Sequence, residues 1–123
     1  MRVAKRRGVD YETARQLGLA LPGVEEGPCY GTPALRVKGK LMLRLKEDGE
    51  TVVLIVGFER RSLLMEKDPA TFFITDHYRN YPSVLVRLPR ISRKELAGLI
   101  EEAWRRAAPK RLVQELDAKP RAR

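Results

Sequence analysis

The chain has 123 residues, 43% of them hydrophobic and 33% charged, which suits one folded domain and excludes an intrinsically disordered chain. One cysteine and one histidine exclude an internal disulfide and argue against a zinc site, and we expect neither a metal nor a cofactor. The formal net charge of +9 raises the question of a polyanionic partner.

The positive charge is concentrated at the two ends of the sequence. Residues 1–8 contain four basic side chains and no acidic ones, and residues 118–123 contain three basic and no acidic ones. We therefore predict a nearly neutral domain over residues 9–117 between two basic, flexible tails, 1–8 and 118–123. No apolar run approaches the ~20 residues that span a bilayer, so we expect no membrane association, and the single cysteine suits a reducing cytoplasm.

The first predicted element is a helix that begins near Asp10, a suitable N-cap residue. Ala14, Leu17 and Leu21 recur at spacings of three and four residues, which places them on one helical face. Pro22 and Gly23 end this helix. The Gly- and Pro-rich segment 24–33 is then expected to be a loop or a short edge strand.

Two half-buried strands follow, over residues 34–38 and 40–46, separated by Gly39. Strict alternation predicts that the apolar residues point to one side, namely Leu35, Val37, Leu41, Leu43 and Leu45. The same alternation predicts that the remaining side chains point to the other side, namely Arg36, Lys38, Lys40, Met42, Arg44 and Lys46.

An Asp-Gly turn at residues 47–50 leads into a β-branched segment, 51–56, which is typical of a central strand covered on both faces. A short helix is predicted over residues 59–67, with Leu63, Leu64 and Met65 facing inward. Residues 71–75 and 83–88 are predicted strands joined by the polar, aromatic loop 76–82.

The last long helix opens with Ser92-Arg-Lys-Glu95, which has the pattern of a capping box. Its apolar stripe includes Trp104, which we expect in the core. Pro109 ends the helix, and a last short turn passes through Leu112 and Leu116. The predicted fold is therefore a single α+β domain of order α-β(3)-α-β(2)-α, with an antiparallel five-stranded sheet and helices packed mainly on one face.

Several short segments carry a family resemblance: Leu21-Pro-Gly-Val24, Tyr30-Gly-Thr-Pro-Ala34, Arg36-Val-Lys-Gly-Lys40, Phe72-Phe73, His77-Tyr78, Val84–Leu88 and Ala103-Trp104. Together they resemble the MmcQ/YjbR family over roughly residues 10–112. The resemblance implies the same α-β(3)-α-β(2)-α fold and a DNA-binding role, through likeness to a double-wing DNA-binding domain. It implies no catalytic residues.

The first candidate site is a cationic stripe in which no acidic residue intervenes: Arg36, Lys38, Lys40, Arg44 and Lys46. If these side chains neutralise four or five phosphates, the log–log salt slope of binding is about −4. The alternative is a solvated sheet face whose lysines discourage aggregation. Glu47, Asp48 and Glu50 in the adjoining turn can also quench the charge.

The second candidate site is the loop 76–82, because His77, Tyr78, Arg79 and Tyr81 combine stacking surfaces with a cation. The alternative is that these rings simply pack on the base of the hairpin. A catalytic pairing of Cys29 with His77 requires the two to lie within hydrogen-bond distance, and we expect both to be structural or inert.

The sequence therefore predicts a non-enzymatic protein that binds DNA, weakly and largely nonspecifically, through the outer sheet face and the loop 76–82. One alternative is a module for protein interaction or self-association, such as a homodimer formed through the free sheet face or an edge strand. Another is a small-molecule or enzymatic role in a pocket near Cys29 and His77.

Overall fold

The computed structural model describes residues 8–119. Within this range the helices are α1 (Tyr11–Leu19), α2 (Phe58–Lys67), α3 (Arg93–Ala107) and α4 (Lys110–Ala118). The strands are β1 (Val24–Cys29), β2 (Thr32–Val37), β3 (Lys40–Leu45), β4 (Thr51–Ile55), β5 (Phe72–Phe73) and β6 (Ser83–Arg87), with short 3-10 turns η1 (Asp76–Tyr78) and η2 (Leu88–Arg90). Residues 1–7 and 120–123 of the predicted tails lie outside the described residues.

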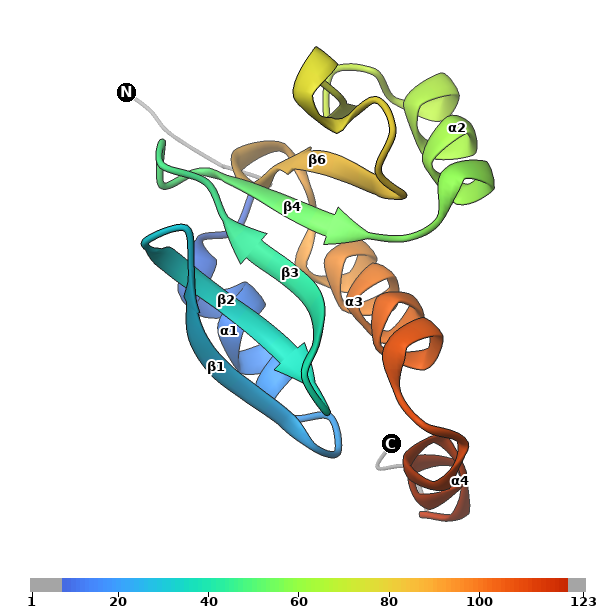
Figure 1. Ribbon diagram of the computed structural model, residues 1–123. Coiled ribbons are helices and arrows are strands. Elements are labelled where there is room, and N and C mark those ends of the chain that lie inside the picture. The colour runs from blue at the N-terminus through green and yellow to red at the C-terminus, as the bar shows by residue number, and fades with distance from the viewer. Residues whose placement is uncertain (1–7, 120–123) are drawn as a thin grey trace.

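The strands form one antiparallel sheet in the order β1-β2-β3-β4-β6-β5. Figure 1 shows β1 to β4 and β6 of this sheet. The predicted α+β class and element order are confirmed, but the predicted count of five strands is wrong. The sixth strand is β1, which pairs with β2 along its whole length although it contains Gly27 and Pro28. An edge strand tolerates proline because one row of its backbone groups has no partner strand.

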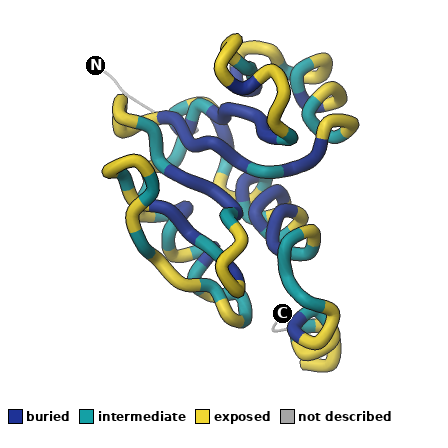
Figure 2. Tube along the Cα trace, viewed as in Figure 1, coloured by how far each residue is buried: buried dark blue, intermediate teal, exposed yellow. Residues whose placement is uncertain are grey.

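Helices α1 and α3 pack on one face of the sheet, and Figure 1 shows α1 behind β1 and β2. This face carries the main core, in which Leu35, Leu43, Leu54 and Val84 are fully buried. Figure 2 shows buried segments along the central strands and α3. The predicted helix 59–67 exists as α2, but its inward face is narrower than expected. Leu64 is buried, whereas Leu63 is 53% exposed.

Trp104 is buried in this core, as predicted, and its indole Nε1 donates a hydrogen bond of 2.9 Å to the carbonyl oxygen of Pro22. This bond ties α3 to the loop that ends α1. Leu112 of α4 lies beside Gly23 in the same loop, so α4 extends the predicted short turn into a helix that covers the junction.

The predicted helix caps are largely confirmed. Asp10 accepts a hydrogen bond of 3.0 Å from the backbone N–H of Thr13, and Ser92 accepts one of 3.1 Å from that of Glu95. The reciprocal half of the capping box is replaced, because the Glu95 carboxylate pairs with Lys67 of α2 at 3.0 Å. That ion pair ties α2 to α3.

The opposite face of the sheet, called the outer face below, is covered in part by the chain itself. Strand β4 is central and buried on both sides, as predicted. On the outer face Val53 and Leu85 form a small second core with Tyr78, against which Phe73 also packs. The loop 76–82 therefore supplies the cover that β4 needs. None of the helices in residues 8–119 is long and apolar enough to cross a membrane.

Candidate nucleic-acid interface

A β-bulge breaks the predicted cationic stripe. Leu35 pairs with Leu43 but the next residue, Arg36, pairs with Leu41, so Met42 is an extra residue in β3. Such a bulge shifts the alternation of side chains in the strand that contains it. Met42 is consequently buried in the main core, and Leu41 lies on the outer face with Arg36. The predicted orientations of Leu41 and Met42 are wrong for this reason.

The five cations of the stripe therefore do not share one surface. Lys40 pairs with Val37, a core residue, and so lies at the end of the sheet on the helix side. Lys38 has φ +50° and sits in the two-residue turn between β2 and β3. The outer face retains Arg36, Arg44 and Lys46. The prediction of a continuous five-residue stripe is wrong.

Arg44 is also buried, with 6% of its surface exposed, rather than free for a ligand. Its Nη1 donates hydrogen bonds to the Thr32 hydroxyl at 2.7 Å and to the Leu45 carbonyl at 3.2 Å, and its Nη2 donates to the Tyr78 hydroxyl at 3.4 Å. Glu47 lies 3.6 Å from Nη1. Burial lowers the pKa of Arg44, but the Tyr78 hydrogen bond and the nearby groups outweigh burial and raise it, so the guanidinium stays charged.

Tyr30 lies above Arg44, with the guanidinium carbon 5.3 Å from the centre of its ring. Tyr30 and Gly31 form the two-residue turn between β1 and β2, and both have positive φ, +54° and +80°. This is the backbone pattern of a type I′ hairpin turn, which favours Asn or Gly at its first position. The Tyr30 side chain is nevertheless 84% exposed. The turn thus holds a bare aromatic ring over the outer face.

The loop 76–82 supplies the other rings, and an arginine of α2 fixes its shape. The Nη1 of Arg61 donates hydrogen bonds to the carbonyl oxygens of Tyr78, Tyr81 and Ser83 at 3.1, 2.8 and 3.3 Å. Its Nη2 donates to the Arg79 carbonyl at 3.1 Å. Because one side chain binds three carbonyls of this loop and the first carbonyl of β6, the positions of the loop rings depend on α2.

The rings of this loop differ in their surroundings. Tyr78 is 9% exposed and packs on Val53, as the packing alternative for this loop predicted. Tyr81 is 55% exposed and its ring centre lies 6.4 Å from that of Tyr78. His77 is exposed and packs edge-on against Tyr78 at 4.7 Å. Tyr78 is thus mainly structural, while Tyr81 and His77 present their rings to solvent.

These elements enclose a hollow of about 200 Å³ on the outer face, called the tyrosine pocket below. Its walls are aromatic and come from two hairpin turns: Tyr30, His77, Tyr78 and Tyr81. Its apolar lining comes from β3 and β4: Leu41, Val53 and Ile55. Its remaining lining residues are Arg44 and Ser83, and the Ser83 hydroxyl is buried without a hydrogen-bond partner among residues 8–119.

The cations near this pocket differ in how free they are. Lys46 lies over the Tyr78 ring, with Nζ 5.5 Å from its centre. Arg36 is half-buried and pairs in register with Glu25 of β1, and neither it nor Lys46 forms an ion pair within residues 8–119. Arg79, in contrast, pairs with Asp76 in its own loop. Arg36 and Lys46 are therefore the cations beside the tyrosine pocket that form no ion pair within residues 8–119. Arg87 of β6 also forms none there, but its guanidinium lies over the Phe73 ring and donates a hydrogen bond to the Ala70 carbonyl.

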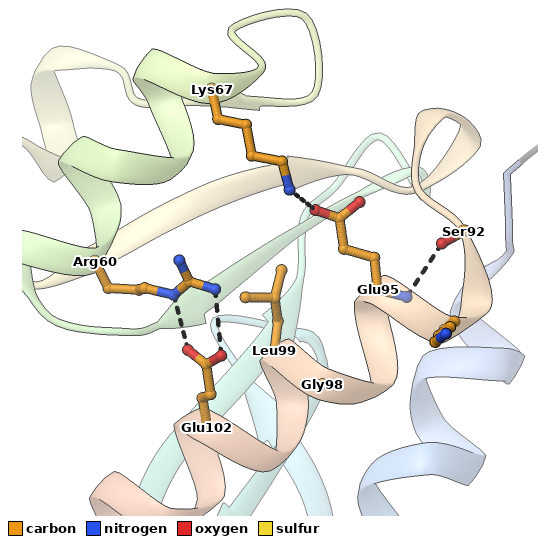
Figure 3. A pocket seen from close by; sticks show the side chains of 8 residues that line it. Arg60, Lys67, Ser92, Glu95, Gly98, Leu99 and Glu102 are labelled. Atoms are coloured by element: carbon orange, nitrogen blue, oxygen red, sulfur yellow. Dashed lines mark hydrogen bonds and ion pairs between the residues drawn. The ribbon is translucent and has the colours of Figure 1, made fainter.

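A second hollow, of about 410 Å³, lies between α2 and α3 (Figure 3). Arg60 binds Glu102 through two hydrogen bonds of 2.8 and 3.2 Å, and Lys67 pairs with Glu95. Figure 3 shows these pairs crossing from one helix to the other over Leu99. The charged groups form ion pairs with one another, so we interpret this hollow as part of the α2–α3 contact rather than as a binding site.

Side chains that bind metal ions do not cluster in the part of the chain that is described. No group of three or more His, Cys, Asp or Glu side chains there could hold a metal ion. His77 contacts tyrosine rings, and Cys29 does not line the tyrosine pocket.

Tyr30, Leu41, Arg61 and Ser83 contribute to this site although the sequence did not indicate them. Only Tyr30 carried a signal: it precedes a glycine between two strand-like segments, as Lys38 does. Arg61 resembles any other exposed helical arginine in the sequence, and its bonds to the loop depend on the tertiary fold.

Comparison with known proteins adds a family and a fold. A family model for YjbR matches residues 19–106. An uncharacterized protein of Mycobacterium bovis and one of Mycobacterium tuberculosis are each 49% identical over 51 residues, 42% of this chain and 40% of the relative. The chain thus spans about two fifths of the length of the curated relatives it matches.

One solved structure has the same fold. It is the crystal structure of a Deinococcus radiodurans protein with the family-model domain DUF419, with a TM-score of 0.71 over 95% of this chain and 94% of that one. At 18% identity this likeness shows the fold alone.

Proposed function

The chain belongs to the YjbR family, and from this premise we propose that it binds nucleic acid through the outer face of its sheet, by binding rather than by catalysis. The observation that carries the proposal is an aromatic-walled pocket whose surroundings include the cations Arg36 and Lys46. Aromatic rings combined with backbone-neutralising cations are the usual means of holding nucleic acid without sequence preference.

The electrostatic support comes from a small number of charges. Arg36 and Lys46 have no ion-pair partner within residues 8–119, whereas Arg44 and Arg79 have Glu47 and Asp76. Glu25 faces Arg36 across the β1–β2 pair and offsets part of its charge. We therefore expect weak, salt-sensitive binding in which roughly two phosphates are neutralised by this face.

Self-association through a sheet edge finds less support. The free edge of β1 contains Pro28 and the acidic residues Glu25 and Glu26, and the other edge strand, β5, is two residues long. Short, charged or proline-containing edges discourage the addition of another strand. The central strand β4, whose uncovered apolar face would have favoured a partner, is already covered by Tyr78.

The test uses the full chain and a fluorescently labelled single-stranded DNA of about a dozen nucleotides, within the range of site sizes for such proteins. Fluorescence anisotropy is recorded at several salt concentrations. The double variant Arg36→Gln/Lys46→Gln is expected to reduce the log–log salt slope by about 1.4, which is two single-strand phosphate contacts.

The matched control is Lys94→Gln/Lys110→Gln, which removes the same charge from exposed positions on α3 and α4. We expect its salt slope to stay within experimental error of the parent. An equal loss in both double variants would attribute binding to overall charge and would overturn the proposal. So would the absence of binding by the full chain at low salt.

A further inference from the structure

Neither the core nor the turn geometry of this fold requires an aromatic side chain at position 30. Its side chain is 84% exposed, and its φ of +54° lies in the left-handed region that disfavours residues with a Cβ. The same turn geometry occurs at Lys38, where the side chain points into solvent. A strained, exposed aromatic residue that faces a pocket is a feature of ligand-binding sites rather than of hairpin turns.

The dimensions of the tyrosine pocket select a flat, single ring system. Its volume of about 200 Å³ lies below the roughly 300–1,000 Å³ of pockets for drug-sized ligands. Tyr30 approaches from the β1–β2 turn and Tyr81 from the loop 76–82, so the exposed rings face the hollow from two sides. Leu41 and Ile55 supply apolar lining on which a ring can rest.

The positive charge of Arg44 in the pocket lining decides which kinds of flat ligand can bind. An aromatic cage can hold an organic cation, but Arg44 keeps a positive charge in the lining, and like charges repel. A neutral ring is not repelled by the charge of Arg44, and phosphates that continue from such a ring fit the cations Arg36 and Lys46. The buried hydroxyl of Ser83 gives such a ring one further hydrogen-bonding group.

Resting on the nucleic-acid role proposed above, we propose that the tyrosine pocket holds one unpaired base of a single-stranded nucleic acid. A base within a duplex is stacked on both faces and hidden from Tyr30 and Tyr81, whereas an unpaired base can enter. Single strands are therefore preferred to duplexes, and the preference comes from the base rather than from the phosphates.

The experiment compares two strands of equal charge. One is a labelled strand of about a dozen thymidines, and the other carries the same number of deoxyribose phosphates without bases. By anisotropy at low salt, the full chain is expected to bind the base-bearing strand about tenfold more tightly, since one stacked base accounts for a factor of this order. The corresponding duplex should bind no better than the baseless strand.

Variants at the two similar turns locate the effect. Tyr30→Asn suits the turn and removes the ring, so the preference for bases should be lost, whereas Tyr30→Phe keeps the ring and should keep the preference. Lys38→Asn introduces the same residue at the corresponding position of the β2–β3 turn and should leave the preference for bases intact.

The outcomes separate this inference from the proposed function. Equal affinity for both strands, with binding that still depends on Arg36 and Lys46, overturns the base pocket and leaves the nucleic-acid role standing. Absence of binding to either strand overturns both. If free thymidine monophosphate displaces the strand at an equal concentration, the pocket is a mononucleotide site and the single-strand proposal is wrong.

Discussion

Replacing Tyr30 by asparagine is expected to leave the stability of the fold almost unchanged, although it removes a whole aromatic side chain. Placing asparagine instead of a bulky residue in the left-handed region stabilises the folded state by about 1–2 kcal/mol. Against this, the exposed cation–π contact with Arg44 is lost, at about 0.5 kcal/mol. The variant also loses the small buried part of the ring, at most about 30 Å² of apolar surface, which costs about 0.8 kcal/mol more.

These terms nearly cancel, so we expect the free energy of unfolding to change by less than about 0.5 kcal/mol. Lys38→Asn gains the same backbone relief without losing a ring contact, and it should stabilise the protein by about 1 kcal/mol. For comparison, Tyr78→Ala removes a buried ring from the outer-face core and should cost about 3 kcal/mol.

The assay is urea unfolding followed by fluorescence of Trp104, the single tryptophan of the chain and a fully buried one. A loss of more than about 2 kcal/mol in Tyr30→Asn would show that the fold depends on this ring. Tyr30 would then serve the fold, and its exposed position would no longer indicate a ligand.

Two further predictions concern the supports of the pocket, and a third concerns the turn between β3 and β4. Ser83→Ala removes a buried hydroxyl that has no partner among residues 8–119, so stability should not fall by more than about 0.5 kcal/mol while thymidine-strand affinity weakens. Tyr11→Phe is its control, because that hydroxyl is likewise buried without a partner in the described chain but does not line the pocket; strand affinity should not change. Burial, the largest cause, raises the pKa of Tyr11 to about 12, so the control removes a neutral group over the working pH range. Arg61→Lys loses the guanidinium that binds three carbonyls of the loop 76–82 and that of Ser83, and it should cost about 2 kcal/mol in urea unfolding, with the preference for base-bearing strands reduced; an unchanged preference would refute its positioning role. At Asp48 burial raises the pKa, but hydrogen bonds from the Glu50 and Thr51 backbone and the Thr51 hydroxyl outweigh burial and lower it. A lowered pKa in the folded state means that this stabilisation is complete above the ordinary value of 3.8 and is lost as the pH falls through the folded pKa. Asp48→Asn should therefore lose less stability than the parent between about pH 5 and pH 2 in urea titrations, and parallel curves would contradict the assignment.

The sequence predicted the fold well where one local rule decides the outcome. The caps at Asp10 and Ser92, the apolar stripe around Trp104 and the two-sided burial of β4 follow from periodicity and hydrogen-bonding propensity, and the structure has all of them. Strand β1 was left open between loop and strand because its glycine and proline oppose strand formation locally. Pairing with β2 overrides that local preference.

The site was less predictable from the sequence because its geometry depends on a β-bulge at one residue, Met42. Lys40, Met42 and Arg44 alternate as in a regular strand, and no residue type in the segment signals a bulge. Once Met42 enters the core, Leu41 turns to the outer face and becomes lining of the pocket. The burial of Arg44 likewise depends on Thr32 and Tyr78, which only the tertiary fold brings together.

The roles of the residues in the loop 76–82 were predicted in part from the sequence. Its rings were identified from the sequence as either stacking surfaces or packing groups, and the structure divides them, with Tyr78 packed and Tyr81 exposed. The clamp by Arg61 that fixes this division spans many intervening residues. A pattern within the loop cannot reveal it.

The most direct measurement is a map of backbone amide chemical shifts in the full chain as the thymidine strand is added. If a base enters the tyrosine pocket, the largest changes fall on the outer face, at Tyr30, Leu41, Arg44, Tyr81 and Ser83, and α3 and α4 change little. Changes that centre on α3 and α4, or that spare these five residues, would contradict the binding of a base there.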